Sequence, residues 1–425
     1  MKRYLAIILS VVLLKFSADG NEFSRLFADS TLRVDYALCA DRGKVNAYLH
    51  EMKKSEGWAG RRHNLDSLAL KGNGQVTMRS ADGGEVLYTQ SFSTLMQEWL
   101  STAEAKDGCR SWEMTALLPL PREKSMIELT LTDMRHDTIA RCMTVYDPAD
   151  ILVAGCPKTV PDSVYLLRSK RNDAIDVVLL GEGYTQAERD SFLHHASVAV
   201  DEIMSYEPWL QSADKWNFVA VFTPSRQSGV SVPIKGKWLD TAFGAHFSTF
   251  YSDRYLTTPH VWALHDAASG VPYEHIVVLA NTDEYGGGGI YNNYTLTAAR
   301  NEWFRPVVVH EFGHSFGGLA DEYFYEGDVM EDSYPADIEP WEPNITTLVD
   351  FDSKWRYLLD DSVPVPTPPA KMGKYPVGVY EGGGYSAKGV YRPAFECRMR
   401  NNSYSTFCGA CVSALSRLID FYTKD

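Results

Sequence analysis

The sequence predicts an α/β (α+β) domain, with a twisted mixed sheet and a long buried helix, preceded by a mostly-β sandwich domain. In the first third of the chain, short segments alternate apolar and polar residues, and turn residues separate them. In the remainder, apolar runs of the length of a buried strand alternate with helical patterns. Residues 304–309 are apolar apart from Arg305, so we expect their helix to be buried. We place the sandwich at residues 21–160 and the α/β domain at residues 161–425.

The chain opens with the pattern of a secretory signal peptide. Two basic residues, Lys2 and Arg3, precede an apolar run at residues 4–14, which is too short to span a membrane. Small residues stand before Asn21, so we predict that residues 1–20 are removed by cleavage. We therefore expect an exported protein, in the periplasm, on the cell surface or in the medium, without stable membrane insertion. The alternative is an uncleaved segment that remains as a membrane anchor.

The predicted sandwich domain consists mainly of strand patterns. Short strands at close intervals favour two antiparallel sheets packed together, and residues 47–54 and 93–105 are expected to be short helices. This part has no catalytic cluster, so we expect it to support the second domain, with glycan or protein binding as the alternative. The expected strands are residues 31–40, 75–79, 85–89, 113–118, 126–131 and 139–146.

The second domain is predicted to open with a buried strand at residues 176–180. Thr185 then caps a helix that runs to about Glu202, and Glu188 completes a capping box. Four consecutive glycines at residues 286–289 predict a flexible loop. The remaining expected elements are strands at residues 218–222 and 275–280, an extended proline-rich connector at 360–369 and a closing helix at 412–422.

The most informative stretch is His310-Glu311-Phe312-Gly313-His314. On a helix, His310 and His314 project from one face about one turn apart, so they can hold one metal ion. Glu311 lies beside them, where it can take a proton from a water molecule that the metal activates. The pattern predicts one zinc ion per chain with its own general base. The alternative is a core helix whose two histidines are satisfied by hydrogen bonds.

The residues after this helix offer a third metal ligand. In the metzincin pattern H-E-x-x-H-x-x-G-x-x-H, that ligand stands three residues after the glycine. Counted from Gly317 the position is Ala320, which cannot bind a metal, and counted from Gly318 it is Asp321, which can. We predict Asp321 as the third ligand, with Glu322 as the alternative.

Further residues are expected around the metal. Metzincins carry a methionine turn beneath it, for which Met399 is the candidate. Tyr404 lies five residues on and can donate its hydroxyl to an oxyanion, with a packing aromatic as the alternative. Residues 283–294 are expected to form the upper rim, where an edge strand pairs with an extended substrate. A mobile surface loop is the alternative for this segment.

These motifs resemble those of the IgA-peptidase-like metallopeptidases, secreted bacterial enzymes with a metzincin-like zinc site. The resemblance implies a zinc endopeptidase with His310, His314 and Asp321 as ligands and Glu311 as base. We expect it to act on protein or glycoprotein substrates. It does not imply cleavage of immunoglobulin A. The N-terminal third is similar, less closely, to the β-rich domain that precedes this peptidase in many members. The similarity is carried by residues 176–185 (DVVLLGEGYT), 224–233 (PSRQSGVSVP), 310–323 (HEFGHSFGGLADEY), 343–358 (PNITTLVDFDSKWRYL) and 391–402 (YRPAFECRMRNN).

The net charge and the cysteines of the chain limit the partners and sites that we expect. The net charge of −14 argues against nucleic acid as a partner, and we expect a monomer or weak oligomer. Of the seven cysteines, Cys397 can form a disulfide with Cys408 or Cys411, since export permits disulfides, but the sequence does not fix the connectivity. A single C-x-x-C without a second pair does not predict a structural zinc site. The alternative function from another class is an exported surface protein that binds glycan or protein and holds a purely structural metal ion.

Overall fold

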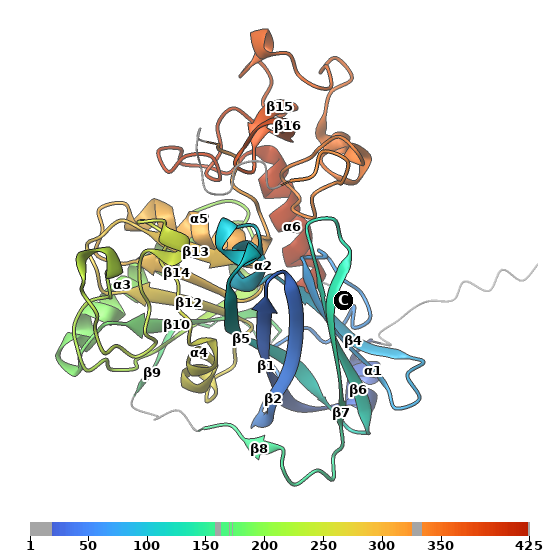
Figure 1. Cartoon of the computed structure of the whole chain (residues 1–425), viewed down its shortest axis with the longest axis vertical. Coiled ribbons are helices and arrows are strands. Elements are labelled where there is room, and N and C mark those ends of the chain that lie inside the picture. The colour runs from blue at the N-terminus through green and yellow to red at the C-terminus, as the bar shows by residue number, and fades with distance from the viewer. Residues whose placement is uncertain (1–18, 158–162, 170, 172, 325–333, 424–425) are drawn as a thin grey trace, which may run out of the picture.

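The structure, a computed structural model, describes residues 19–157, 163–169, 171, 173–324 and 334–423 (Figure 1). The described chain is a mixed α/β protein in which a β-rich N-terminal part lies beside a six-stranded sheet with its helices. Residues 1–18 of the expected signal peptide lie outside this description, so its cleavage stays a prediction. Every helix among the described residues is too short or too polar to traverse a bilayer.

Two four-stranded sheets pack face to face in the N-terminal part. Their strand orders are β5-β1-β2-β8 and β4-β3-β6-β7. Leu32 and Val34 of the first sheet and Val76 and Ile127 of the second are fully buried in one shared core, which agrees with the expected sandwich. The elements of this part are α1 (Asp19–Leu26), β1 (Phe27–Asp41), β2 (Lys44–Glu56), β3 (Gly74–Ser80), β4 (Val86–Phe92), α2 (Leu95–Leu100), β5 (Cys109–Pro121), β6 (Ser125–Thr132), β7 (Thr138–Tyr146) and β8 (Ala154–Gly155).

Two segments of this part were expected to be helices, and the structure corrects one of them. Residues 47–54 belong to the strand β2, so that prediction is wrong. Their Ala, Leu, Glu, Met and Lys residues favour a helix locally, but β2 pairs antiparallel with β1 along most of its length, and this non-local pairing decides the outcome. Residues 93–105 contain the helix α2, which Thr94 caps by accepting a hydrogen bond from the Gln97 N–H.

The second part is built on a six-stranded sheet with the order β13-β14-β12-β10-β11-β9. Its inner strands β11, β10, β12 and β14 are parallel, and the edge strands β9 and β13 run antiparallel to their neighbours. Every residue of β12 is buried, as expected for a strand covered on both faces. The strands are β9 (Val164–Arg168), β10 (Ile175–Glu182), β11 (Trp216–Val221), β12 (His275–Ala280), β13 (Gly287–Ile290) and β14 (Tyr294–Ala298).

Helices cover this sheet on both faces. On one face α3 (Arg189–Ile203) and α5 (Phe304–Gly317) share a core with the sheet, and α4 (Val261–Ala268) belongs to the core on the other face. The predicted capping box is present, because Thr185 N donates to Glu188 Oε2 over 2.8 Å. The predicted burial of the α5 segment is also confirmed, since Val308 and Val309 have no exposed surface.

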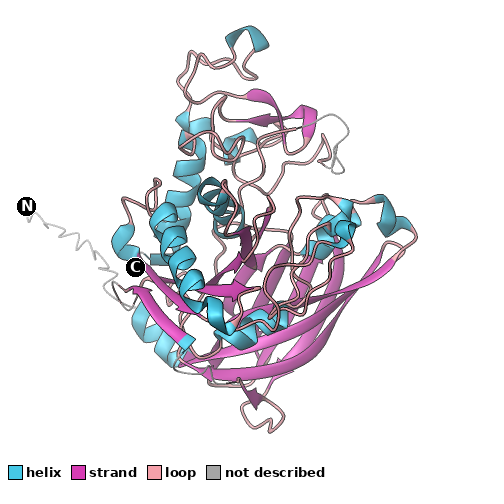
Figure 2. Ribbon diagram, turned by 90° about the vertical axis from the view of Figure 1, so that its left-hand side faces the viewer, coloured by secondary structure: helices cyan, strands magenta, loops and turns pink. Residues whose placement is uncertain are grey.

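A smaller unit stands at one end of the molecule, above the sheets in Figures 1 and 2. It contains the hairpin of β15 (Tyr380–Gly383) and β16 (Ser386–Arg392), and the helix α6 (Gly409–Thr423) leads from it back toward the sheets. The expected closing helix is therefore present and begins three residues earlier than predicted. Its residue Leu415 packs so closely on α5 that a Cβ at Gly317 would collide with it.

Candidate metal centre

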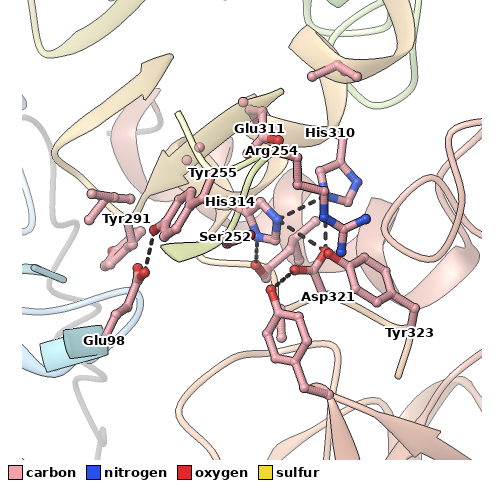
Figure 3. A pocket seen from close by; sticks show the side chains of 18 of the residues that line it. Glu98, Ser252, Arg254, Tyr255, Tyr291, His310, Glu311, His314, Asp321 and Tyr323 are labelled. Carbon is pink, nitrogen blue, oxygen red and sulfur yellow. Dashed lines mark hydrogen bonds and ion pairs between the residues drawn. The ribbon is translucent and has the colours of Figure 1, made fainter. Parts of the chain in front are cut away.

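The helix α5 presents two histidines to one point in space. His310 and His314 are one turn apart on the same face, and their Nε2 atoms lie 3.0 Å from each other. Oδ1 of Asp321 lies 3.0 Å from Nε2 of His310 and 3.4 Å from Nε2 of His314. Figure 3 shows the three side chains converging. The structure thus brings together the three residues predicted as ligands.

The spacing of these atoms fits a tetrahedral zinc ion. Ligand atoms about 2.0–2.1 Å from such an ion lie roughly 3.3–3.4 Å apart, close to the distances between the three atoms. Oδ1 of Asp321 is buried and has no well-directed hydrogen bond within the described structure. A buried carboxylate oxygen without a donor is costly unless a cation satisfies it. The donor set of two imidazoles and a carboxylate also suits zinc.

Hydrogen bonds to backbone carbonyls fix both imidazole rings. Nδ1 of His310 donates to the carbonyl of Arg398 over 3.1 Å, and Nδ1 of His314 donates to the carbonyl of Leu319 over 2.5 Å. Because a carbonyl oxygen only accepts, the proton of each neutral ring sits on Nδ1 and the lone pair on Nε2 faces the centre. Such partners orient metal-binding histidines and raise their basicity.

The turn after α5 carries Asp321 back toward the histidines. Gly318 ends the helix in the left-handed conformation, with φ of 58°, which a glycine adopts without a steric clash. The amide of Asn344 then pairs with both backbone groups of Ala320, over 2.7 and 2.9 Å. The side chain of Glu322, the alternative ligand, is fully buried elsewhere and lies beside Asn344 and three cysteines. It is therefore Asp321 that faces the histidines.

Asp321 and His314 shift each other's pKa. Burial pushes the pKa of Asp321 upward, but the neighbouring charge of His314 outweighs it and holds the pKa well below its usual range. Burial lowers the pKa of His314, yet the charge of Asp321 raises it to about 9. Asp321 is thus a carboxylate at neutral pH, the form that binds metal.

Glu311 lines the same cavity on the side of β13. The glycines of that strand allow the close approach, because a Cβ at Gly287 would lie 2.7 Å from Oε1 of Glu311. A Cβ at Gly289 would collide with the Glu311 carbonyl. Burial raises the pKa of the Glu311 carboxyl. The glycine run, expected to be a flexible loop, is therefore mainly an edge strand pressed against the helix, and that prediction is wrong in its secondary structure.

The rim predicted at residues 283–294 does border the cavity, since the four glycines, Ile290 and Tyr291 line it. The outer edge of β13 is partly covered, because Leu256 N donates to the carbonyl of Gly287 over 3.3 Å. Apart from this contact, β14 is the strand that pairs with β13 in the part of the chain that the structure describes.

Met399, the candidate for a methionine turn, packs against α5, the helix that carries His310 and His314. It is fully buried, and a Cβ at Gly313 of α5 would lie 2.9 Å from its sulfur. Its carbonyl accepts the N–H of Glu322 over 2.8 Å, which joins this turn to the loop that carries Asp321.

The structure does not bring Tyr404 to the cavity. Among the described lining residues are its neighbours Asn402 and Ser403 but not Tyr404 itself. The tyrosine at the centre is Tyr385, whose hydroxyl donates to Oδ2 of Asp321. Its backbone has φ of 62°, an unusual value for a side chain of this size. Three glycines, residues 382–384, precede Tyr385. Such a run allows the chain to approach other backbone closely, and it was the sequence feature that could have indicated Tyr385.

The cavity has a volume of about 750 Å³ and borders both parts of the chain. From the N-terminal part, Glu98 of α2 contributes a half-buried carboxyl that accepts a hydrogen bond from Tyr255 (Figure 3). Burial raises the pKa of Glu98 to about 7. Arg254 lies over the ring of Tyr323, 5.9 Å from its centroid, and lines the same space. The N-terminal part thus forms a wall of the site, which sequence reasoning did not anticipate.

Comparison with known families agrees with this geometry. The family model described as IgA Peptidase M64 matches residues 164–375 and 370–419, and the model described as Peptidase M64 N-terminus matches residues 22–142. No curated protein matches the chain.

Proposed function

We propose that this chain, which belongs to the IgA peptidase M64 family, is an exported zinc-dependent endopeptidase of protein or glycoprotein substrates. Family membership makes it a metallopeptidase. The choice of zinc, the endopeptidase mode, export and the boundaries 1–20, 21–160 and 161–425 are our proposal. The observation that carries the proposal is the convergence of His310, His314 and Asp321 beside Glu311 in one cavity.

The proposed chemistry is hydrolysis with a general base. Zinc held by His310, His314 and Asp321 would lower the pKa of a water molecule and polarise the scissile carbonyl. Glu311 accepts the proton of that water and passes it to the leaving amine. A carboxyl whose pKa is raised by burial suits both steps, because it binds the proton firmly enough to carry it and still releases it.

The domain is proposed to be metzincin-like. Three features support this: the metal-binding helix α5, the buried Met399 behind it and the antiparallel edge strand β13 along the cavity. An extended substrate would add to the uncovered part of β13 by backbone hydrogen bonds. The wall that α2 contributes would then restrict which side chains fit on the opposite side.

Tyr385 is the tyrosine whose removal we expect to matter. Tyr385→Phe takes away the hydroxyl that holds Oδ2 of Asp321, and the loss of such a partner typically costs about 10- to 100-fold in metal affinity or activity. Steady-state kinetics and zinc titration of Tyr385→Phe and Tyr404→Phe, side by side, test this. An equal or larger loss in Tyr404→Phe would return the oxyanion role to Tyr404, as predicted from the sequence.

A cleavage screen tests the proposed function as a whole. The full chain is incubated with a mixture of proteins and glycoproteins, with and without a chelator, and new termini are sequenced. We expect internal cleavages that the chelator abolishes and that added Zn²⁺ restores. If the zinc-loaded protein binds glycoproteins but cleaves nothing, the alternative of an exported binding protein with a structural metal ion replaces the peptidase proposal.

A further inference from the structure

We propose that this chain holds a second, structural zinc ion on Cys397, Cys408, Cys411 and Glu322. These side chains come from three separate segments: the methionine turn, the start of α6 and the loop after α5. One ligand atom from each lies within 4.8 Å of all the others. The inference does not rest on the proposed peptidase activity.

The distances between the sulfur atoms favour a shared ion. Sγ of Cys397 lies 3.7 Å from Sγ of Cys411. Thiolates about 2.3 Å from a tetrahedral zinc ion lie roughly 3.8 Å apart, whereas a disulfide requires about 2.05 Å. All seven cysteines are described and each has a free thiol, so the structure has no disulfide between Cys397 and Cys408 or Cys411.

The carboxylate of Glu322 is a second, independent indication of a metal ion at this site. Glu322 is 0% exposed, and its Oε2 has no hydrogen-bond partner among the described residues. Its Oε1 lies 3.0 Å from the amide of Asn344, 3.1 Å from Sγ of Cys411 and 4.0 Å from Sγ of Cys408. None of these neighbours carries a positive charge, and no ion pair of Glu322 occurs in the described structure. A fully buried carboxylate with an unsatisfied oxygen calls for a cation.

The local chain suits thiolate ligands. Cys408 and Cys411 form the C-x-x-C at the N-terminus of α6, where backbone N–H groups favour negative charge. The N–H of Cys408 points to Sγ of Cys397 over 3.3 Å. Three thiolates and a carboxylate around Zn²⁺ carry a net charge of −2, the same as a Cys₄ zinc site. Binding displaces the thiol protons to solvent and involves no oxidation. Sulfur ligands favour zinc over calcium or magnesium.

The second site lies directly behind the first. Glu322 follows Asp321, and Cys397 precedes Arg398, whose carbonyl holds the ring of His310. An ion at this site would tie the loop after α5, the methionine turn and α6 together. It would thereby position Asp321, a ligand of the first centre, and the Arg398 carbonyl that orients His310.

Metal analysis of the full chain tests this proposal. We expect two zinc ions per wild-type chain and one in Cys411→Ser. After exchange with Co²⁺, the wild type should show a sulfur-to-cobalt charge-transfer band. That band should disappear in Cys411→Ser and persist in His314→Ala, which removes a ligand of the first centre only. Cys142→Ser, at a thiol in β7 outside the cluster, is the matched control and should keep both the band and two ions.

Two further measurements keep the test decisive if Cys411→Ser fails to fold. Titration of wild-type thiols with an organic mercurial should release one zinc ion per chain, and Glu322→Gln, which keeps the side-chain size, should weaken retention of that ion. A wild-type protein without the cobalt band, with a disulfide among the three cysteines in non-reducing peptide maps, would overturn the proposal. A cobalt band in a protein that cleaves nothing would instead sustain this site and count against the peptidase.

Discussion

The Asp321→Ala variant is expected to lose one zinc ion per chain, and with it all measurable peptidase activity. Asp321 supplies the carboxylate among the three converging ligands, and its Oδ1 lies within 3.4 Å of both imidazole nitrogens. Removing an outer partner of a metal ligand already costs about 10- to 100-fold, so the loss of the ligand itself should exceed that range. Metal content after dialysis and cleavage rates at saturating substrate measure the two effects.

The matched control for this variant is Asp361→Ala, at an exposed carboxylate of the same domain. It changes the net charge equally and should leave zinc content and rate unchanged. Asp321→Ala removes a side chain whose other oxygen accepts the Tyr385 hydroxyl, so circular dichroism should accompany the assay to exclude unfolding. Full zinc occupancy in a folded Asp321→Ala protein would show that Asp321 is not a ligand.

The parts of the site that could be predicted from the sequence depend on local geometry. The i and i+4 spacing of His310 and His314 fixes their common face once the segment is helical. The position of Asp321 follows from the left-handed cap at Gly318, because the helix end sets where the next turn begins. The capping box of Thr185 and Glu188 is likewise a contact between residues three apart.

The parts that could not be predicted depend on contacts between distant segments. Tyr385 reaches Asp321 because Gly384 N donates to the carbonyl of Asp321 over 2.8 Å, which fastens the hairpin loop to the metal loop. Glu98 enters the cavity from a different part of the chain altogether. The fourth ligand proposed for the cysteine cluster, Glu322, is 75 residues or more from each thiol by the numbering. No local sequence pattern predicts these contacts between distant residues, and a single C-x-x-C does not indicate which carboxylate lies beside it.

Replacing Glu311 is expected to stop catalysis without removing zinc. Glu311→Gln keeps the size of the side chain beside Gly287 but cannot accept a proton, and Glu311→Ala removes the group entirely. Positioned general acid–base catalysis is worth about 10²- to 10⁴-fold, so kcat should fall by roughly that factor in both variants. Zinc content should match the wild type, because Glu311 is not among the three converging ligand groups.

The combination of retained metal and lost rate separates Glu311 from the ligands. Loss of a metal ligand lowers metal content and rate together, as we expect for Asp321→Ala, whereas loss of the base lowers the rate alone. Comparing Glu311→Gln with Glu311→Ala separates loss of the base from loss of packing. The amide of glutamine keeps the packing against β13, whereas the methyl group of alanine does not. If both variants keep nearly the wild-type rate with full zinc, another group must take the proton, and the assignment of Glu311 as base would be wrong.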